Sequence, residues 1–300
     1  MGQHDSDRFG AVRERLDSAF LGLERLRNRE GVSGEYLDFE KQLIASRTKA
    51  IFRIANTRRI AAHLSETFQA ECIEHPEESS PVVEAAALTL EEFRIAVEHG
   101  DFPVRIRDAV ATIKKAIAAD KHLTERLVVA LLKPSPQEIS LLGAELEMEA
   151  DLLHFLGREL LKPFFHLLAA VQFTAKTAEK WNQGRCPMCN GFPHIARLEK
   201  ESGARWLRCD LCDVEWKFER LTCPFCGNIA AEESRYFTVS EDDAMRVSVC
   251  DKCQSYIKTY DERKSMASTQ LLVEDAGSLA LDMIAQREGF VHANMGMRFD

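Results

Sequence analysis

The sequence lacks the features that most often reveal an enzyme or a membrane protein. It has no GxxxxGK[ST] or GxGxxG loop for phosphate groups, no GxSxG nucleophile turn and no HExxH zinc motif. No apolar run reaches the roughly 18 residues of a membrane-spanning helix, so we expect no membrane partner. The opening residues MGQHDSDRFG contain no apolar segment typical of a secretory signal. These absences predict a cytoplasmic protein that is not an enzyme.

Positive charge is also scarce. The chain of 300 residues has a formal net charge of −9. Residues 184–262, which hold most of the cysteines, contain 11 lysines and arginines and 14 aspartates and glutamates. Nucleic-acid-binding domains usually carry a basic patch, so we expect no nucleic-acid partner. Arg205 and Arg208 beside Trp206 keep a zinc-ribbon nucleic-acid binder open as a third interpretation.

The cysteines have a regular spacing. Eight of the nine form four Cys-x-x-Cys pairs between residues 186 and 253. Two thiolates at this spacing in a tight turn can bind one metal ion, so two pairs complete a tetrahedral site. In a reducing compartment such thiolates bind metal and do not form disulfides. Redox dithiols are the alternative, but a thioredoxin-like protein has one such pair within a βαβ pattern.

An internal repeat decides how the pairs are matched. CPMCNG, PHIARL, RWLRCDLC and VEWKFER in the first unit correspond to CPFCGN, RYFTV, MRVSVCDKC and SYIKTY in the second. Each unit reads as knuckle, strand, turn, strand, knuckle and strand, which is the plan of a zinc ribbon or rubredoxin-like module. We predict two metal sites, the first formed by Cys186, Cys189, Cys209 and Cys212 and the second by Cys223, Cys226, Cys250 and Cys253.

The identity of the metal is not decided by these residues, because tetrahedral sites of four thiolates suit both zinc and iron. Gly191 and Gly227 follow the first knuckle of each unit, where we expect glycine to permit a positive φ. Asp213 and Gln254 follow the second knuckles, so these turns are expected to have a different backbone or some strain.

Other candidate residues are assigned structural roles. Cys72 stands alone at the end of a predicted helix and is expected to be a small buried apolar residue. His194 lies close to the first site, but four cysteines already complete that site, so we expect a strand residue. Four thiolates also leave no open coordination position for catalysis. Alternation in VEWKFER predicts that Trp216 and Phe218 belong to the core.

Residues 1–183 have helical periodicity almost throughout. We expect helices near 9–29, 36–68, 82–99, 103–119, 122–132, 136–162 and 163–181, with a break at Pro163. Short connections favour a helical bundle. The predicted fold class is α+β, with a helical domain (1–183), two tandem rubredoxin-like or zinc-ribbon metal modules (184–221 and 222–262) and a C-terminal helix with its tail (263–300).

The cysteine region resembles the formate dehydrogenase accessory protein FdhE family. The similarity lies in CPMCNGFP, RWLRCDLCDVEWKFERLTCPFCGN and VCDKCQSYIKTYD, and extends to EDAGSLALDMIAQREGF and YLDFEKQLIA. Some members have glycine where this chain has Asn190. The resemblance implies a cytoplasmic maturation factor that binds the catalytic subunit of formate dehydrogenase. It also implies iron, in two FeS4 rubredoxin-type sites held by the eight paired cysteines, with zinc as the alternative.

A rubredoxin-like electron-transfer protein is the second interpretation, because FeS4 centres carry one electron. The large helical domain speaks against it, since an electron carrier does not need one. The sequence leaves the oligomeric state open.

Overall fold

The computed structural model describes residues 3–29, 31–65, 80–132, 136–238, 244–265 and 270–292. The chain divides into two compact units: the first comprises Met1–Leu16 and Asp38–Gln172, and the second comprises Asp17–Leu37 and Phe173–Asp300. Cys72 and most of the predicted HPEESSP loop lie outside the described residues. The predicted limits of the helical domain and the two metal modules stay a prediction.

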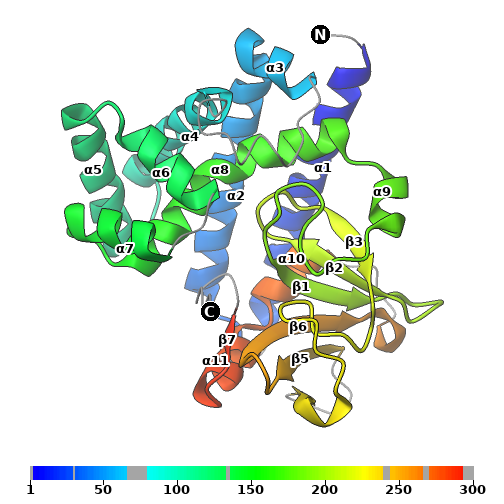
Figure 1. Cartoon of the computed structure of the whole chain (residues 1–300). Helices are drawn as coiled ribbons and strands as arrows, with labels where there is room; N and C mark the ends of the chain where they lie inside the picture. The colour runs from blue at the N-terminus through cyan, green and yellow to red at the C-terminus, as the bar shows by residue number, and fades with distance from the viewer. Residues whose placement is uncertain are drawn as a thin grey trace. The chain divides into compact units, whose positions relative to one another are not determined.

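The first unit is helical, as the periodicity predicts (Figure 1). The helices that contribute to it are α1 (Gln3–Arg25), α2 (Gly34–Asn56), α3 (Arg58–Ser65), α4 (Ser80–His99), α5 (Val104–Ala119), α6 (Leu123–Leu132), α7 (Pro136–Glu145) and α8 (Ala150–Gln172). α8 packs against α3, α4, α6 and α7. Its side chains Phe164, Phe165 and Leu167 are completely buried, so α8 supplies much of the core of this unit.

Three helix boundaries differ from the prediction. The expected break at Pro163 is wrong, because α8 continues through this proline. Side chains on both sides of Pro163 are buried, and their packing outweighs the loss of one N–H donor.

The helix expected over 136–162 instead ends earlier, where α7 stops and Glu147 has a φ of 51°. The N–H groups of Met148 and Glu147 donate back into the last turn at 2.8 and 3.3 Å, as in a Schellman cap. The expected long helix from residue 36 is likewise divided, at Thr57.

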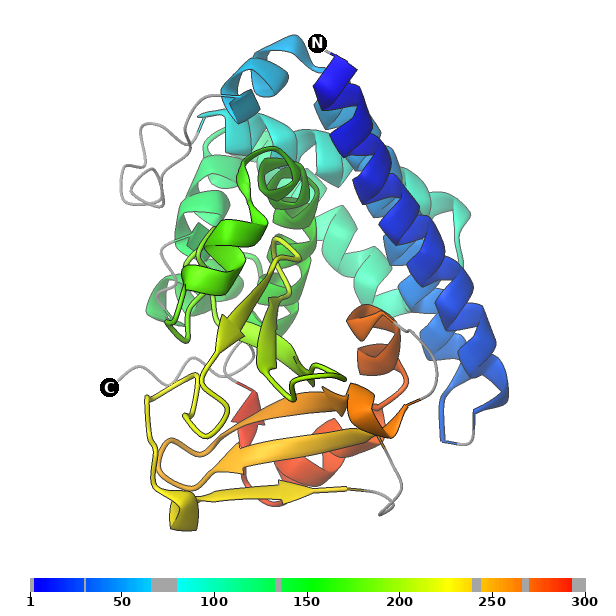
Figure 2. The ribbon, with the colours of Figure 1, turned by 90° about the vertical axis from the view of Figure 1, so that its right-hand side faces the viewer.

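The second unit contains a sheet that is seven-stranded within the described residues (Figure 2). Its strands are β1 (Pro193–Leu198), β2 (Arg205–Cys209), β3 (Glu215–Phe218), β4 (Ser234–Phe237), β5 (Met245–Cys250), β6 (Ser255–Asp261) and β7 (Val291–His292). The order is β3-β2-β1-β6-β5-β4, and β7 pairs with β6. Each half of the repeat is an antiparallel triplet, and parallel pairing of β1 with β6 joins them. The two ribbons therefore share one sheet.

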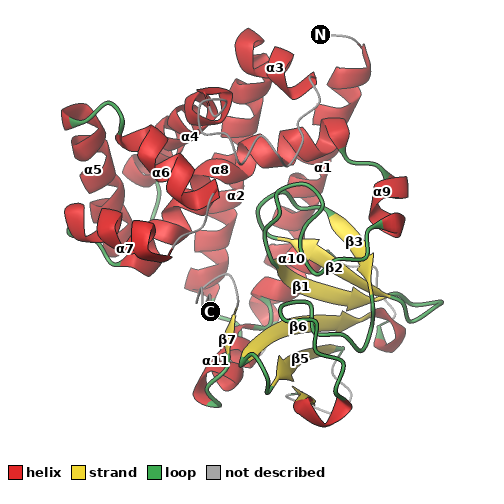
Figure 3. Cartoon of the chain, in the orientation of Figure 1, coloured by secondary structure: helices red, strands yellow, loops and turns green. Residues whose placement is uncertain are grey.

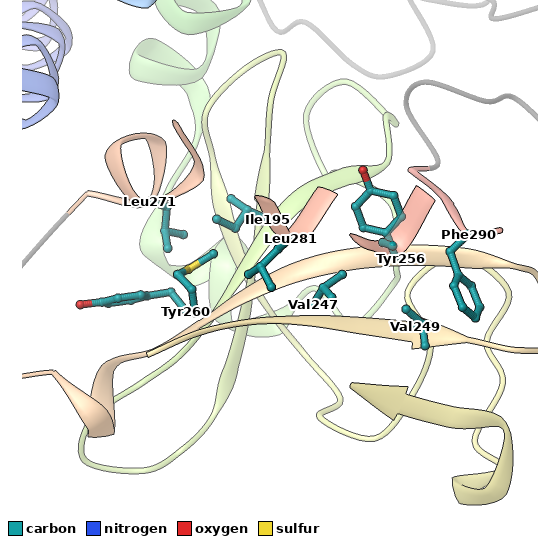
Figure 4. Packing of buried hydrophobic residues seen from close by; sticks show 10 residues of the cluster. Ile195, Val247, Val249, Tyr256, Tyr260, Leu271, Leu281 and Phe290 are labelled. Atoms are coloured by element: carbon teal, nitrogen blue, oxygen red, sulfur yellow. The ribbon is translucent and has the colours of Figure 1, made fainter. Parts of the chain in front are cut away.

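The second unit also contains Asp17–Leu37, from the end of α1 to the start of α2, and several short helices (Figure 3). The expected C-terminal helix is two helices, α10 (Leu271–Ala276) and α11 (Leu279–Arg287), joined by a turn. α10 contacts β1 and β6, whereas α11 contacts β5 and β6. Leu281 and Phe290 pack with Val247 in one buried apolar cluster on this face of the sheet (Figure 4). The remaining short elements are α9 (Ala175–Lys180) and the 3-10 turns Leu26–Asn28, Ala231–Glu233 and Glu262–Lys264.

A buried charge cluster lies beside the apolar one. Lys258 is only 2% exposed, and its Nζ lies 2.6 Å from an oxygen of Asp282 and 2.7 Å from one of Asp275. Burial lowers the pKa of Lys258, but the two carboxylates raise it by more, so the amine stays charged. The Tyr256 hydroxyl donates to Asp282 at 2.9 Å, and a ring nitrogen of His194 lies 2.9 Å from Asp275. These contacts fix α10 and α11 on the sheet.

We expect Lys258→Met to lower the free energy of unfolding by about 3 kcal/mol, because the partly buried carboxylates of Asp275 and Asp282 lose the cation that they share. Lys217→Met is the matched control, since Lys217 is an exposed lysine of the same sheet and its loss should change stability by no more than about 0.5 kcal/mol. Urea unfolding of both variants measures the difference. Equal small effects would show that the charge cluster does not stabilise the unit.

Candidate metal centres

The four Cys-x-x-Cys pairs form four similar tight turns. In three of them the residue after the second cysteine donates its N–H to the carbonyl of the first, at 3.0 to 3.1 Å. The backbone at this position is left-handed in all four turns, with φ of 55° at Asn190, 64° at Asp213, 70° at Gly227 and 54° at Gln254. A positive φ is therefore required directly after the second cysteine of each knuckle.

This geometry corrects one expectation and refines another. Gly191 is not the residue with positive φ, because Asn190 holds that place. Asp213 and Gln254 do not have a different backbone and adopt the strained conformation instead. Asn and Asp tolerate it better than Gln does. Buried Asp213 forms an ion pair with Arg208, and the side chain of Gln254 donates to a backbone carbonyl at 2.6 Å, so local bonds hold both turns.

The first group of cysteines is enclosed by the protein. Cys186, Cys189, Cys209 and Cys212 are all buried, and their sulfur atoms lie within 4.8 Å of one another. The Sγ–Sγ distances include 3.3 Å from Cys186 to Cys212 and 3.9 Å from Cys189 to Cys212. A tetrahedral ion with metal–sulfur bonds of about 2.3 Å separates its sulfur ligands by about 3.8 Å. The group is therefore close to the size that one such ion needs.

The second group has similar dimensions but is open on one side. The Sγ–Sγ distance is 3.7 Å between Cys223 and Cys253 and 3.8 Å between Cys226 and Cys250. These values match the tetrahedral separation. Cys226 is exposed and Cys253 is half-buried, whereas the other two are buried. Solvent can therefore reach the second group.

The surroundings of the sulfur atoms favour a bound cation. Burial raises the pKa of the Cys186 and Cys212 thiols well above the usual value, so four thiolates together would be unstable without a positive charge between them. The Met188 N–H donates to Cys186 Sγ at 3.4 Å, and the Asn228 side chain donates to Cys250 Sγ at 3.8 Å. Donors to sulfur and four thiolates suit zinc or iron.

The segments around the first knuckle of each cysteine group contact each other. A Cβ atom on Gly184 would lie 1.9 Å from the carbonyl oxygen of Pro224, so only glycine fits there. The rings of Phe192 and Phe225 meet edge to face, with centroids 5.6 Å apart. The sequence shows Gly184 only as a boundary, because its neighbour Pro224 lies in the other half of the repeat.

The other candidate residues have structural roles. His194 lies in β1, as expected, and contacts Asp275. Trp216 and Phe218 are buried, as the alternation predicts. Arg205 and Arg208 are each 8% exposed, so they are not available to a nucleic acid.

Within the described ranges, no further group of three or more histidine, cysteine or acidic side chains has metal-binding spacing. A search of the same ranges finds no helix with the length and apolar content needed to cross a membrane.

Two family models match the cysteine region. They are described as "FdhE, central domain", over residues 185–220, and "FdhE, C-terminal domain", over residues 221–297. A "Protein FdhE homolog" from Aquifex aeolicus (strain VF5) is 36% identical over 159 residues, covering 51% of this chain and 55% of that protein. This chain thus matches about half the length of that relative. A second homolog, from Proteus mirabilis (strain HI4320), is 24% identical over 273 residues, covering 87% of this chain and 80% of that protein.

A solved structure has the same fold. The crystal structure of the FdhE protein from Pseudomonas aeruginosa superposes with a TM-score of 0.64 at 18% sequence identity, and the match covers 94% of both chains. The α+β arrangement of helices and sheet is therefore shared over almost the whole length.

Proposed function

We propose that this chain, which belongs to the FdhE family, is a maturation factor that binds the catalytic subunit of respiratory formate dehydrogenase in the cytoplasm. The observation that carries the proposal is the pair of four-cysteine groups built into one sheet. A metal with four protein ligands has no position for a substrate, so its role is to hold a binding surface in shape and not to catalyse a reaction.

The eight paired cysteines are the proposed metal ligands, with iron as the metal and zinc as the alternative. A rubredoxin-type iron can accept or give one electron, whereas zinc only stabilises the fold. The protein supplies the left-handed knuckle turns that aim the sulfur atoms and the N–H groups that donate to them.

Exposed apolar side chains support a protein partner at the second ribbon. Among the described residues of the second unit, the three most exposed large apolar side chains are Leu221, Ile229 and Tyr236, at 79%, 75% and 63%. Leu221 and Ile229 flank the first knuckle of the second group, and Tyr236 lies on the edge strand β4. Exposed apolar residues around a rigid centre are typical of a binding surface.

Co-purification with the client tests this function. The tagged chain is expected to retain the catalytic subunit of formate dehydrogenase, and a Leu221→Asp, Ile229→Asp variant to retain at least about tenfold less, as for contact hot spots. Leu141→Asp is the matched control, because Leu141 is a 70% exposed leucine of α7 in the other unit. Metal content is measured in each variant to show that the centres are intact. A native chain that retains no subunit would contradict the proposal.

Electron transfer is a second candidate, favoured by the open side of the second group. The exposed Cys226 would let a redox partner approach the metal. Reversible reduction of the iron-loaded protein, with electrons passing to formate dehydrogenase, would support this function over maturation alone.

A further inference from the structure

Arg205 is a buried cation with no carboxylate partner among the described residues. It begins β2 and is 8% exposed. Its Nη1 donates to the carbonyl oxygens of Arg220 and Thr222 at 3.2 and 3.0 Å, and its Nε has no hydrogen-bond partner in the described structure. The guanidinium carbon lies 5.8 Å from the ring centroid of Phe218. Arginine is seldom buried to this extent without an acidic group.

Arg205 lies beside the second group of cysteines, because it donates to Thr222, the residue directly before Cys223. Burial lowers the pKa of Arg205 to about 10, an ionised Cys223 would raise this pKa, and the charge of Arg246 lowers it. A divalent ion with four thiolates keeps two negative charges, which is a larger counter-charge than one carboxylate. Thr222 directly precedes Cys223, so the bond from Arg205 to its carbonyl also fixes the start of the knuckle.

Arg205 also connects the two groups. The strand β2 runs from Arg205 to Cys209, a member of the first group. A metal that holds Cys209 therefore holds the strand that presents Arg205 to the second group. The close contact between Gly184 and Pro224 is another link between the two first knuckles.

We propose that Arg205 is a positioning residue of the second metal centre, where it offsets the charge of the metal–thiolate group and orients the Cys223 knuckle. The second centre then depends on a strand that the first centre holds in place. This inference rests on the proposed metal binding.

Metal release from Arg205 variants tests the inference. The full chain is loaded with zinc, and release to a coloured chelator is followed. The release phase that the Cys226→Ser variant lacks belongs to the second centre. Arg205→Met is expected to release this ion about 10- to 100-fold faster, as for groups that support metal ligands, with the first ion unaffected. Arg205→Lys keeps the charge but loses the planar fork, so its rate should lie between native and Arg205→Met.

Arg197→Met is the matched control. Arg197 is an arginine of the neighbouring strand β1, but its charge is offset by Glu215 and Glu262, at 2.7 and 3.3 Å. This variant should release both ions at native rates. Native release rates in Arg205→Met would overturn the inference. If Arg205→Met loses both ions, the Arg205→Lys variant decides. It must then keep the first ion and release the second ion faster than the native chain does. Release of the second ion at the native rate would overturn the inference.

The reduction potential separates an electrostatic role from a purely structural one. In the iron-loaded protein, Arg205→Met should lower the potential of the second centre, because a nearby positive charge that favours the reduced form is gone. Arg197→Met should leave it unchanged. An unchanged potential in both variants would contradict the electrostatic role. A native chain that holds fewer than two ions would instead contradict the proposed metal binding, so the two failures can be told apart.

Discussion

Cys209→Ser is expected to lose both metal ions and the cooperative unfolding of the second unit. Cys209 is completely buried at the end of β2, and β2 pairs with β1, which joins the second ribbon through β6. A structural tetrathiolate site contributes on the order of 10 kcal/mol, which is comparable to the whole stability of a typical domain. Loss of the first ion should therefore release β2, with Arg205, from the sheet. Metal analysis and thermal unfolding followed by circular dichroism measure both losses.

Cys226→Ser is the matched control for this prediction. Cys226 is the exposed member of the second group, and no strand described in the structure contains it. Its variant should lose one ion, keep the other, and still unfold cooperatively at a lower temperature. A Cys209→Ser chain that keeps both ions would contradict the ligand assignment, and one that keeps a single ion and melts cooperatively would contradict the coupling of the two centres.

A chelator is expected to remove one metal ion quickly and the other slowly. All four cysteines of the first group are buried, whereas Cys226 is exposed and Cys253 is half-buried. A chelator can reach the second ion in the folded protein, but release of the first requires opening of the sheet. Two phases of equal amplitude should appear when release is followed with a coloured chelator at native conditions.

Denaturant distinguishes the two routes of release. Urea below the unfolding midpoint should accelerate the slow phase strongly, because it raises the population of opened sheet, and should change the fast phase little. A single phase for both ions, or equal sensitivity to urea, would contradict the difference in exposure.

The sequence contains enough information to predict the ribbons. Cysteine spacing and the repeat indicate two knuckle-and-strand units, and they match the cysteines into the same two groups of four that lie together in the structure. Their binding of metal stays a proposal. A comparison of the four knuckles could also have found the left-handed position, because Asn190, Asp213 and Gly227 are residue types that tolerate it.

Other features depend on contacts between distant segments. The parallel pairing of β1 with β6 leaves no local signal, because each strand has the same alternation in either arrangement. The break at Glu147 depends on backbone bonds of a helix end, and the continuation through Pro163 depends on burial of α8. The environment of Arg205 is set by the loop that carries Thr222, which only the folded chain brings to β2.

The most direct test of the account is elemental analysis of the native chain purified without oxygen, together with its visible spectrum. The account predicts two metal ions per chain. An iron–thiolate spectrum would identify rubredoxin-type centres, and two zinc ions with no visible absorption would make both centres structural. Fewer than two ions per chain, in protein that is folded and has eight reduced thiols in its paired cysteines, would contradict the assignment of these cysteines as metal ligands.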